Sequence, residues 1–151
     1  MGEPTVIKGA NCQPVIEDKP WGHEVLLGAT PKVAMKQLSI QPFQCTSRQV
    51  HVYRDELYFV TDGYGRLELG ANGDTVHILS RGDVAHIPPG TVHRVYAGAE
   101  GICITEASTQ ELTDVIRLED RYGRPTQSYP SPSPLEPSPT AYSEWYPALP
   151  V

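Results

Sequence analysis

Short apolar runs in which polar residues alternate recur along the chain, and glycine, proline, asparagine and aspartate separate them. Runs of this length, rich in β-branched and aromatic residues, are typical of β-strands, in which successive side chains point to opposite faces. The predicted strands are residues 23–27, 33–40, 48–52, 57–61, 66–69, 75–79, 84–87, 93–96 and 102–106. Asp62 with Gly63 and Asn72 with Gly73 are hairpin signals between such runs.

This even spacing of short strands predicts an all-β fold, a single jelly-roll barrel. Residues 112–121 are expected to form a short C-terminal helical segment after the barrel. The expected organisation is an N-terminal extension over residues 1–18, the barrel over residues 19–124 and a Pro/Ser/Tyr-rich tail over residues 125–151. The length of 151 residues suits one compact domain with such additions.

Two clusters of polar residues carry the candidate chemistry. Gln49 and His51 lie two residues apart, so their side chains leave the same face of a strand, and Glu56 follows a turn. The reversal at Pro88-Pro89-Gly90 leads to His93. A lone histidine is more often a packed or surface residue, so the assignment depends on the combined spacing. We expect Gln49, His51, Glu56 and His93 to hold one divalent metal ion, Zn, Mn, Fe, Co or Ni.

The two clusters together resemble the two sequence motifs of the cupin family. The first motif has the spacing of Gln49, His51, Glu56 and Gly63, with Gln49 in place of the usual first histidine. The second has the spacing of Gly82, Pro88, Gly90 and His93. Phe43 stands where the first motif has glycine, and Ala97 stands where the second often ends in asparagine. The resemblance implies a cupin barrel.

Two flanking segments make the resemblance narrower. Residues 19–22 and 112–124 look like the segments around the isomerase domain of type II mannose-6-phosphate isomerases, which is often fused to a mannose-1-phosphate guanylyltransferase. Matching positions within the barrel are Ser47, Gln49, His51, Arg54 and Glu56, whereas Tyr53 replaces a usual histidine. This resemblance implies a metal-dependent isomerase that stabilises an enediolate, and a homodimer of barrels. The sequence does not identify the base that moves the proton.

The candidate substrate is a small polar metabolite, and a sugar phosphate is one candidate. Aromatic and basic residues near the motifs are the candidate substrate-binding residues: Lys36, Tyr53, Arg54, Tyr58 and Tyr96. Arginine and lysine are the groups that match phosphate oxygens. Two other functions stay open. Two histidines and a carboxylate also suit a non-haem iron oxygenase, and the barrel alone suits a non-catalytic sugar or metabolite binding module.

Charge and cysteine content exclude other classes. The formal net charge is -6, with 12 basic and 18 acidic residues, which disfavours nucleic acid and acidic membranes as partners. Cys12, Cys45 and Cys103 are an odd number without CxxC spacing, which is typical of reduced thiols. No apolar run reaches the length of a membrane span. We expect a cytoplasmic protein.

The tail over residues 125–151 contains eight of the fifteen prolines. Such a composition is typical of disordered chain, but Tyr142, Trp145 and Tyr146 are large apolar side chains that favour burial. We therefore expect the tail to pack on its own barrel or on a neighbouring one.

Truncation of the chain after Arg124 tests this expectation. Loss of packed aromatic side chains should lower the melting temperature or change the oligomeric state, measured by calorimetry and light scattering. A truncated protein with the same melting temperature and the same mass in solution would show that the tail does not pack on the barrel.

Overall fold

The structure is a computed structural model that describes residue 6 and residues 14–126. The tail beyond residue 126 and Cys12 lie outside the described residues, so the expectations about them stay predictions. The strands are β1 Val15–Lys19, β2 Gly22–Ala29, β3 Val33–Ile40, β4 Arg48–Val50, β5 Glu56–Leu69, β6 Thr75–Ser80, β7 Val84–Ile87, β8 His93–Thr109 and β9 Ile116–Glu119.

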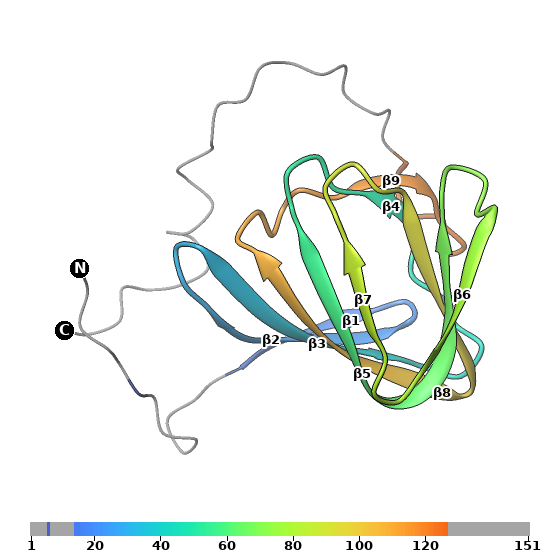
Figure 1. Cartoon of the computed structure of the whole chain (residues 1–151), viewed down its shortest axis with the longest axis horizontal. Coiled ribbons are helices and arrows are strands. Elements are labelled where there is room, and N and C mark those ends of the chain that lie inside the picture. Colours follow the sequence, from blue (N-terminus) through green and yellow to red (C-terminus); the bar gives the residue numbers. More distant parts are fainter. Residues whose placement is uncertain (1–5, 7–13, 127–151) are drawn as a thin grey trace.

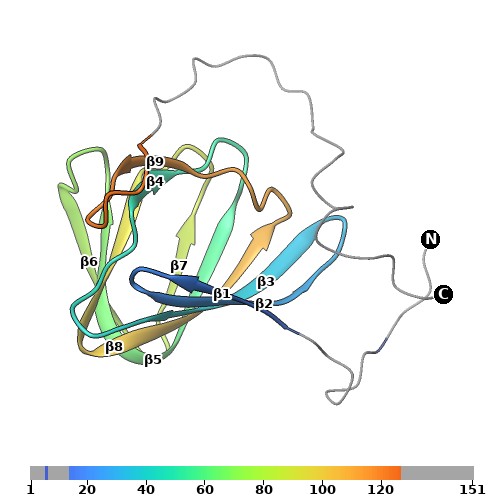
Figure 2. The same ribbon diagram turned by 180° about the vertical axis from the view of Figure 1, so that it is seen from behind.

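All pairings between these strands are antiparallel, in the order β1-β2-β3-β8-β4-β9, with β5 pairing β6, β7 and β8. The sheet curls into a barrel, with β4 and β9 side by side on one side and β1, β2 and β3 on the other (Figures 1 and 2). Apolar side chains from the inner faces form the core, including Leu38, Ile40, Val60, Val95 and Ile104. The predicted all-β jelly roll is confirmed.

The longest strands, β5 and β8, pair from Glu56 opposite Ser108 to Leu69 opposite His93. Each of them contains two of the predicted strands. The pairing shifts register between Val60 and Asp62 and again between Gly63 and Gly65. Such bulges bend a pair of strands, and both strands curl at the lower edge of the barrel in Figure 1.

The hairpin predicted at Asp62 and Gly63 is therefore wrong, because these residues lie inside β5. Gly63 has φ 72°, a left-handed conformation that a bulge needs as much as a hairpin does. A Cβ atom on Gly63 would lie 2.2 Å from the carbonyl oxygen of Gly101 on β8. The chain does change direction at Gly63, but at a corner between two halves of one strand and not at a hairpin between two strands. The second signal, at Asn72 and Gly73, does join β5 to β6.

The helical segment predicted over residues 112–121 is also wrong. This stretch contains turns and then β9, which pairs with β4. Ile116 is buried, and Gln49 on β4 lies opposite Arg117 on β9. The β-branched residues Val115 and Ile116 fit a strand, and pairing with β4 satisfies backbone groups that a helix would have bonded internally.

Two local features concern β1 and the loop after β3. β1 begins at Val15, inside the range expected to be an extension, and pairs with β2 as far as Lys19 opposite Gly22. This hairpin places Trp21 in the core. Phe43, which replaces a motif glycine, has φ 60° and an exposed side chain. The left-handed backbone explains why glycine suits that position.

Substitution of Gly63 tests the corner. Gly63→Ala adds a Cβ against the Gly101 carbonyl, whereas Gly70→Ala, at φ 92°, has open space around its new Cβ. Both alanines incur left-handed strain of about 1–2 kcal/mol. Gly63→Ala should lower the free energy of unfolding, measured in urea, by at least about 2 kcal/mol more than Gly70→Ala does. Equal losses in the two variants would show that the close approach at the corner is not required.

Candidate metal centre

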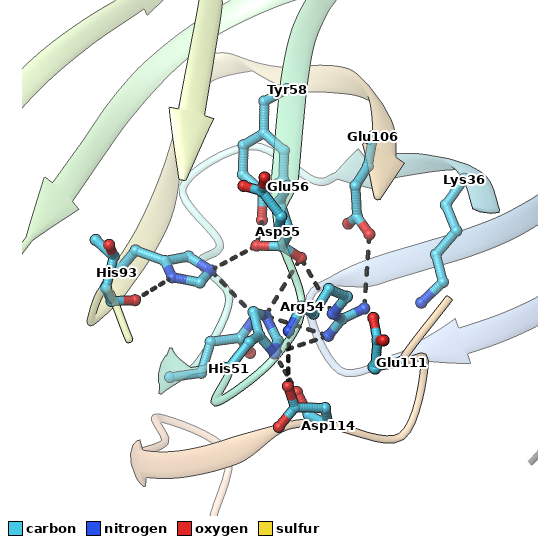
Figure 3. A network of polar contacts seen from close by, with 12 residues as sticks. Lys36, His51, Arg54, Asp55, Glu56, Tyr58, His93, Glu106, Glu111 and Asp114 are labelled. Carbon is cyan, nitrogen blue, oxygen red and sulfur yellow. Dashed lines mark hydrogen bonds and ion pairs between the residues drawn. The ribbon is translucent and has the colours of Figure 1, made fainter. Parts of the chain in front are cut away.

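His51, Glu56 and His93 meet inside the barrel from three different segments (Figure 3). His51 follows β4, Glu56 begins β5 and His93 begins β8. His51 Nε2 lies 3.2 Å from Glu56 Oε1, and His93 Nε2 lies 3.3 Å from Glu56 Oε2. The three potential ligand atoms all lie within 4.8 Å of one another, and each residue is at most 2% exposed. One small cation can therefore be held by all three side chains.

Hydrogen bonds on the far side of each ring orient the two histidines. His51 Nδ1 contacts the backbone carbonyl of Asp114, and His93 Nδ1 lies 2.9 Å from the carbonyl oxygen of Thr91. A carbonyl only accepts, so Nδ1 is the donor in both rings. When Nε2 loses its proton, as binding a metal requires, its lone pair points towards Glu56. Metal-binding histidines are commonly oriented in this way.

The ionisation of these groups suits a cation. Burial raises the pKa of Glu56, but the hydrogen bond and charge of His51, with the charges of His93 and Arg54, outweigh it and lower the pKa to about 2. Burial lowers the pKa of His93, against an opposing effect from Glu56. Glu56 is thus a carboxylate and His93 a neutral imidazole at neutral pH, the forms that coordinate metals.

Gln49 completes the ring of polar groups. Its Nε2 lies 3.5 Å from the Nε2 atoms of both His51 and His93, and its Oε1 accepts a hydrogen bond from the Ser47 hydroxyl at 2.8 Å. Ser47 and Gln49 lie two residues apart, and their side chains share one face of the chain. Ligation through Oε1 requires the amide to turn over, and the Ser47 hydroxyl can then accept instead of donate. Gln49 is therefore placed to serve as a fourth ligand.

Asp114 fixes the loop between His51 and Glu56. Its carboxylate accepts hydrogen bonds from the backbone nitrogens of Val52, Tyr53 and Arg54 at 3.0, 2.7 and 2.9 Å. The same residue therefore holds the loop through its side chain and the His51 ring through its carbonyl. This role was missed in the sequence, although Asp114 lies in a segment singled out by resemblance.

A cavity of about 350 Å³ adjoins the cluster, and Glu56 lines it. The charged residues that line it are Glu17, Lys19, Glu24, Lys36, Arg54, Glu56, Glu106, Arg117 and Arg124. Most of them come from β1, β2, β3 and the segments around β9. Ion pairs join Lys19 to Glu17 at 2.5 Å and Lys36 to Glu24 at 3.4 Å. This volume is in the range of sites for small ligands.

Three of the five candidate substrate-binding residues, Lys36, Arg54 and Tyr58, line this cavity. Tyr53 and Tyr96 do not. Tyr53 lies in the loop that Asp114 holds, and its side chain is 43% exposed. The Tyr96 ring lies 4.1 Å from the guanidinium carbon of Arg66, a cation–π contact on another face of the sheet.

Two further cavity residues were missed in the sequence. Glu106 on β8 is 4% exposed, and Arg117 on β9 has a buried Nε with no hydrogen-bond partner among the described residues. Strand alternation gives a partial signal for Glu106, because this charged residue lies on the same face of the predicted strand as the apolar Ile102 and Ile104. Arg117 had no signal once residues 112–121 were predicted to be helical.

Comparisons with known proteins agree with this fold. Residues 38–104 match a family model described as "Cupin domain". The mannose-1-phosphate guanylyltransferase ManC of Salmonella typhimurium is 31% identical over 110 residues, which are 70% of this chain and 22% of that protein. The alginate biosynthesis protein AlgA of Pseudomonas fluorescens is 30% identical over 72% of this chain and 23% of that protein. The chain thus spans less than a quarter of these relatives.

Solved structures show the same barrel. The capsular polysaccharide assembling protein CapF from Staphylococcus aureus superposes with a TM-score of 0.63 at 18% identity, over 72% of this chain and 33% of that protein. KdgF from Halomonas sp. superposes with a TM-score of 0.58 at 19% identity, over 66% of this chain and 91% of that protein.

Within the described residues, no helix is present that could span a membrane.

Replacement of Asp114 tests how the loop supports the site. Asp114→Ala removes an acceptor from three backbone N–H groups and should lower the free energy of unfolding by about 2 kcal/mol. It should also lower the affinity for Zn²⁺ about 10–100-fold, because the loop after His51 loses its anchor and the backbone carbonyl that orients the His51 ring is no longer held in place. Asp83→Ala is a matched control, because Asp83 accepts from the Ser80 backbone nitrogen in a turn away from the site. Equal Zn²⁺ affinity in the two variants would contradict this role.

Proposed function

Because residues 38–104 of this chain form a cupin domain, we propose that the protein is a metal-dependent enzyme of the sugar-phosphate isomerase type. The observation that carries the proposal is the position of Glu56, which belongs both to the cluster with His51 and His93 and to the lining of the cavity. A ligand in this cavity would therefore lie beside a bound ion.

His51, Glu56 and His93 would hold the ion, and Gln49 would supply a fourth ligand. Three observations support this fit. Glu56 is a carboxylate, His93 is a neutral imidazole, and the Nε2 atoms of both histidines face the Glu56 carboxylate. A divalent ion in such a site polarises a carbonyl or hydroxyl oxygen and stabilises negative charge that develops on it.

Two basic residues of the cavity, Arg117 and Lys36, suit a small anionic substrate. Arg117 lies opposite Gln49 in the β4–β9 pairing, and its buried Nε has no hydrogen-bond partner within residues 14–126. We propose that it binds a phosphate or other anionic group, together with Lys36, while Arg54 and Tyr58 donate to hydroxyl or carbonyl oxygens. The names of the curated relatives refer to mannose 1-phosphate and alginate, which supports a sugar phosphate. The guanylyltransferase activity in the name of ManC is outside the proposal, because the chain covers only 22% of that protein.

The same experiment distinguishes two alternative functions. Two histidines and one carboxylate are also the donor set of non-haem iron oxygenases, and a binding barrel needs no turnover. A homodimer, a cytoplasmic location and the absence of nucleic-acid partners belong to the proposal as expectations, the last from the net charge of -6.

The test begins with elemental analysis of protein purified without chelator, together with His93→Ala and His77→Ala. His77 is an exposed residue of β6 and serves as the matched control. We expect about one equivalent of Zn, Mn, Co or Ni in the wild type and in His77→Ala, and none in His93→Ala, with unchanged far-ultraviolet circular dichroism. The loaded wild type should interconvert mannose 6-phosphate and its ketose isomer, followed by NMR.

Full metal content in His93→Ala would show that the site is elsewhere. Iron in the protein, with oxygen uptake in the presence of a small-molecule substrate, would move the assignment to an oxygenase. Tight binding across a panel of sugar phosphates without turnover would identify a binding module instead.

A further inference from the structure

Glu106 is a buried carboxyl group that the metal cluster does not use. It lies on β8 between Lys36 on β3 and Tyr58 on β5, which are its direct partners across the sheet. Residues directly opposite each other in a sheet point to the same face, and all three line the cavity. Glu106 therefore shares one wall of the cavity with a cation and a phenol.

The charge of Glu106 is only partly compensated. Its Oε1 lies 3.6 Å from Arg54 Nη1 and accepts no hydrogen bond among the described residues, although the side chain is 4% exposed (Figure 3). Arg54 is shared, because its Nη2 lies 2.9 Å from His51 Nδ1 and its Nε lies 3.6 Å from Glu56 Oε1. Lys36 pairs with Glu24 at 3.4 Å. A buried oxygen with no hydrogen bond, facing a cavity, is uncommon without a function.

The other shifted groups of the cavity are poor proton carriers at neutral pH. Glu56 is held as a carboxylate at the metal cluster, with a pKa of about 2. Burial and the charges of Glu56 and Glu106 raise the pKa of Tyr58 well above its usual value, so it stays a phenol. Burial, and then the charge of Glu56, raise the pKa of Glu106 to about 7, against Arg54 and Lys36, with Glu24 adding to the rise. Such a carboxyl group can both accept and return a proton.

We propose that Glu106 is the proton-transferring residue of this site, a catalytic role that rests on the isomerase function proposed above. Its carboxylate takes the proton from the carbon next to the sugar carbonyl. The C–H electron pair forms the enediol double bond, and the carbonyl π pair moves to the oxygen. Return of the proton to the neighbouring carbon, with transfer of the hydroxyl proton between the two oxygens, gives the isomeric sugar phosphate. No oxidant or reductant is consumed.

The test uses the full chain, loaded with the ion found in the wild type, and mannose 6-phosphate in D₂O. NMR then reports both conversion and deuterium incorporation at the carbon next to the carbonyl. Glu106→Gln keeps the shape of the side chain and should reduce both rates by about 10²–10⁴-fold. Metal content and the dissociation constant for mannose 6-phosphate should change less than threefold, which separates a catalytic from a merely structural role.

A control variant and a pH profile test the assignment of Glu106 further. Glu68→Gln is the matched control, because Glu68 is a buried carboxylate paired with Arg48 at 2.8 Å and does not line the cavity. It should retain full turnover. Wild-type kcat/KM should fall on the acidic side of its pH profile while the metal content stays unchanged, because a protonated Glu106 cannot accept a proton. Glu106→Asp retains a carboxylate and should keep this pH dependence at a reduced rate.

The possible outcomes separate this assignment from the function it rests on. Conversion and exchange by Glu106→Gln within threefold of the wild type would overturn the role of Glu106 and leave the isomerase proposal standing. No conversion or exchange by the loaded wild type would overturn both. If Glu106→Gln loses the ion, the role of Glu106 is tested instead by the pH profiles of the wild type and of Glu106→Asp. An acidic limb of the kcat/KM profile in both, at pH values where the metal content is unchanged, supports the role, and its absence from the wild type overturns it.

Discussion

The bend in the β5–β8 pair is the constraint on which the rest of the molecule depends. Glu56 begins β5 at one end of this ribbon, opposite Ser108, and His93 begins β8 at the other end, opposite Leu69. In a straight ribbon these two residues would be separated by its whole length. The bulges around Gly63 fold the ribbon over, so that His93 Nε2 lies 3.3 Å from Glu56 Oε2. The glycine at this corner is thus connected physically to the chemistry on the far side of the barrel.

The interior that the bend encloses is unusually polar for a small barrel. His51, Arg54, Glu56, His93 and Glu106 are all buried. Buried charges cost several kcal/mol each unless partners compensate them, and the two carboxylates of this interior differ in that respect. The carboxylate of Glu56 contacts two imidazoles and lies near Arg54, whereas Glu106 forms an ion pair with Arg54 at 3.6 Å and its Oε1 accepts no hydrogen bond among the described residues. This unevenness is consistent with one group that binds an ion and another that changes its protonation state.

Sequence spacing predicted the barrel well, and it predicted which residues would meet. The pairing of Gln49 and His51 on one face, with Glu56 after the turn and His93 after a proline-glycine reversal, follows from local periodicity and turn chemistry. The hairpin predicted at Asp62 and Gly63 is wrong, because a bulge and a hairpin both favour a glycine in the left-handed conformation. Asp114 and Arg117 could not be found by local patterns, since their roles arise from the pairing of β9 with a strand more than sixty residues earlier. Tyr53 and Tyr96 were near the motifs in sequence, yet they lie away from the cavity.

The metal centre can be located by a crystal structure of the ion-loaded protein, with anomalous diffraction data at the absorption edge of the bound metal. We expect one anomalous peak per chain, about 2.0–2.2 Å from His51 Nε2, His93 Nε2 and a carboxylate oxygen of Glu56. Density for a sugar phosphate soaked into the crystal should lie in the adjoining cavity. A peak at other residues, or no peak between these three side chains at full metal occupancy, would show that the ion is bound elsewhere.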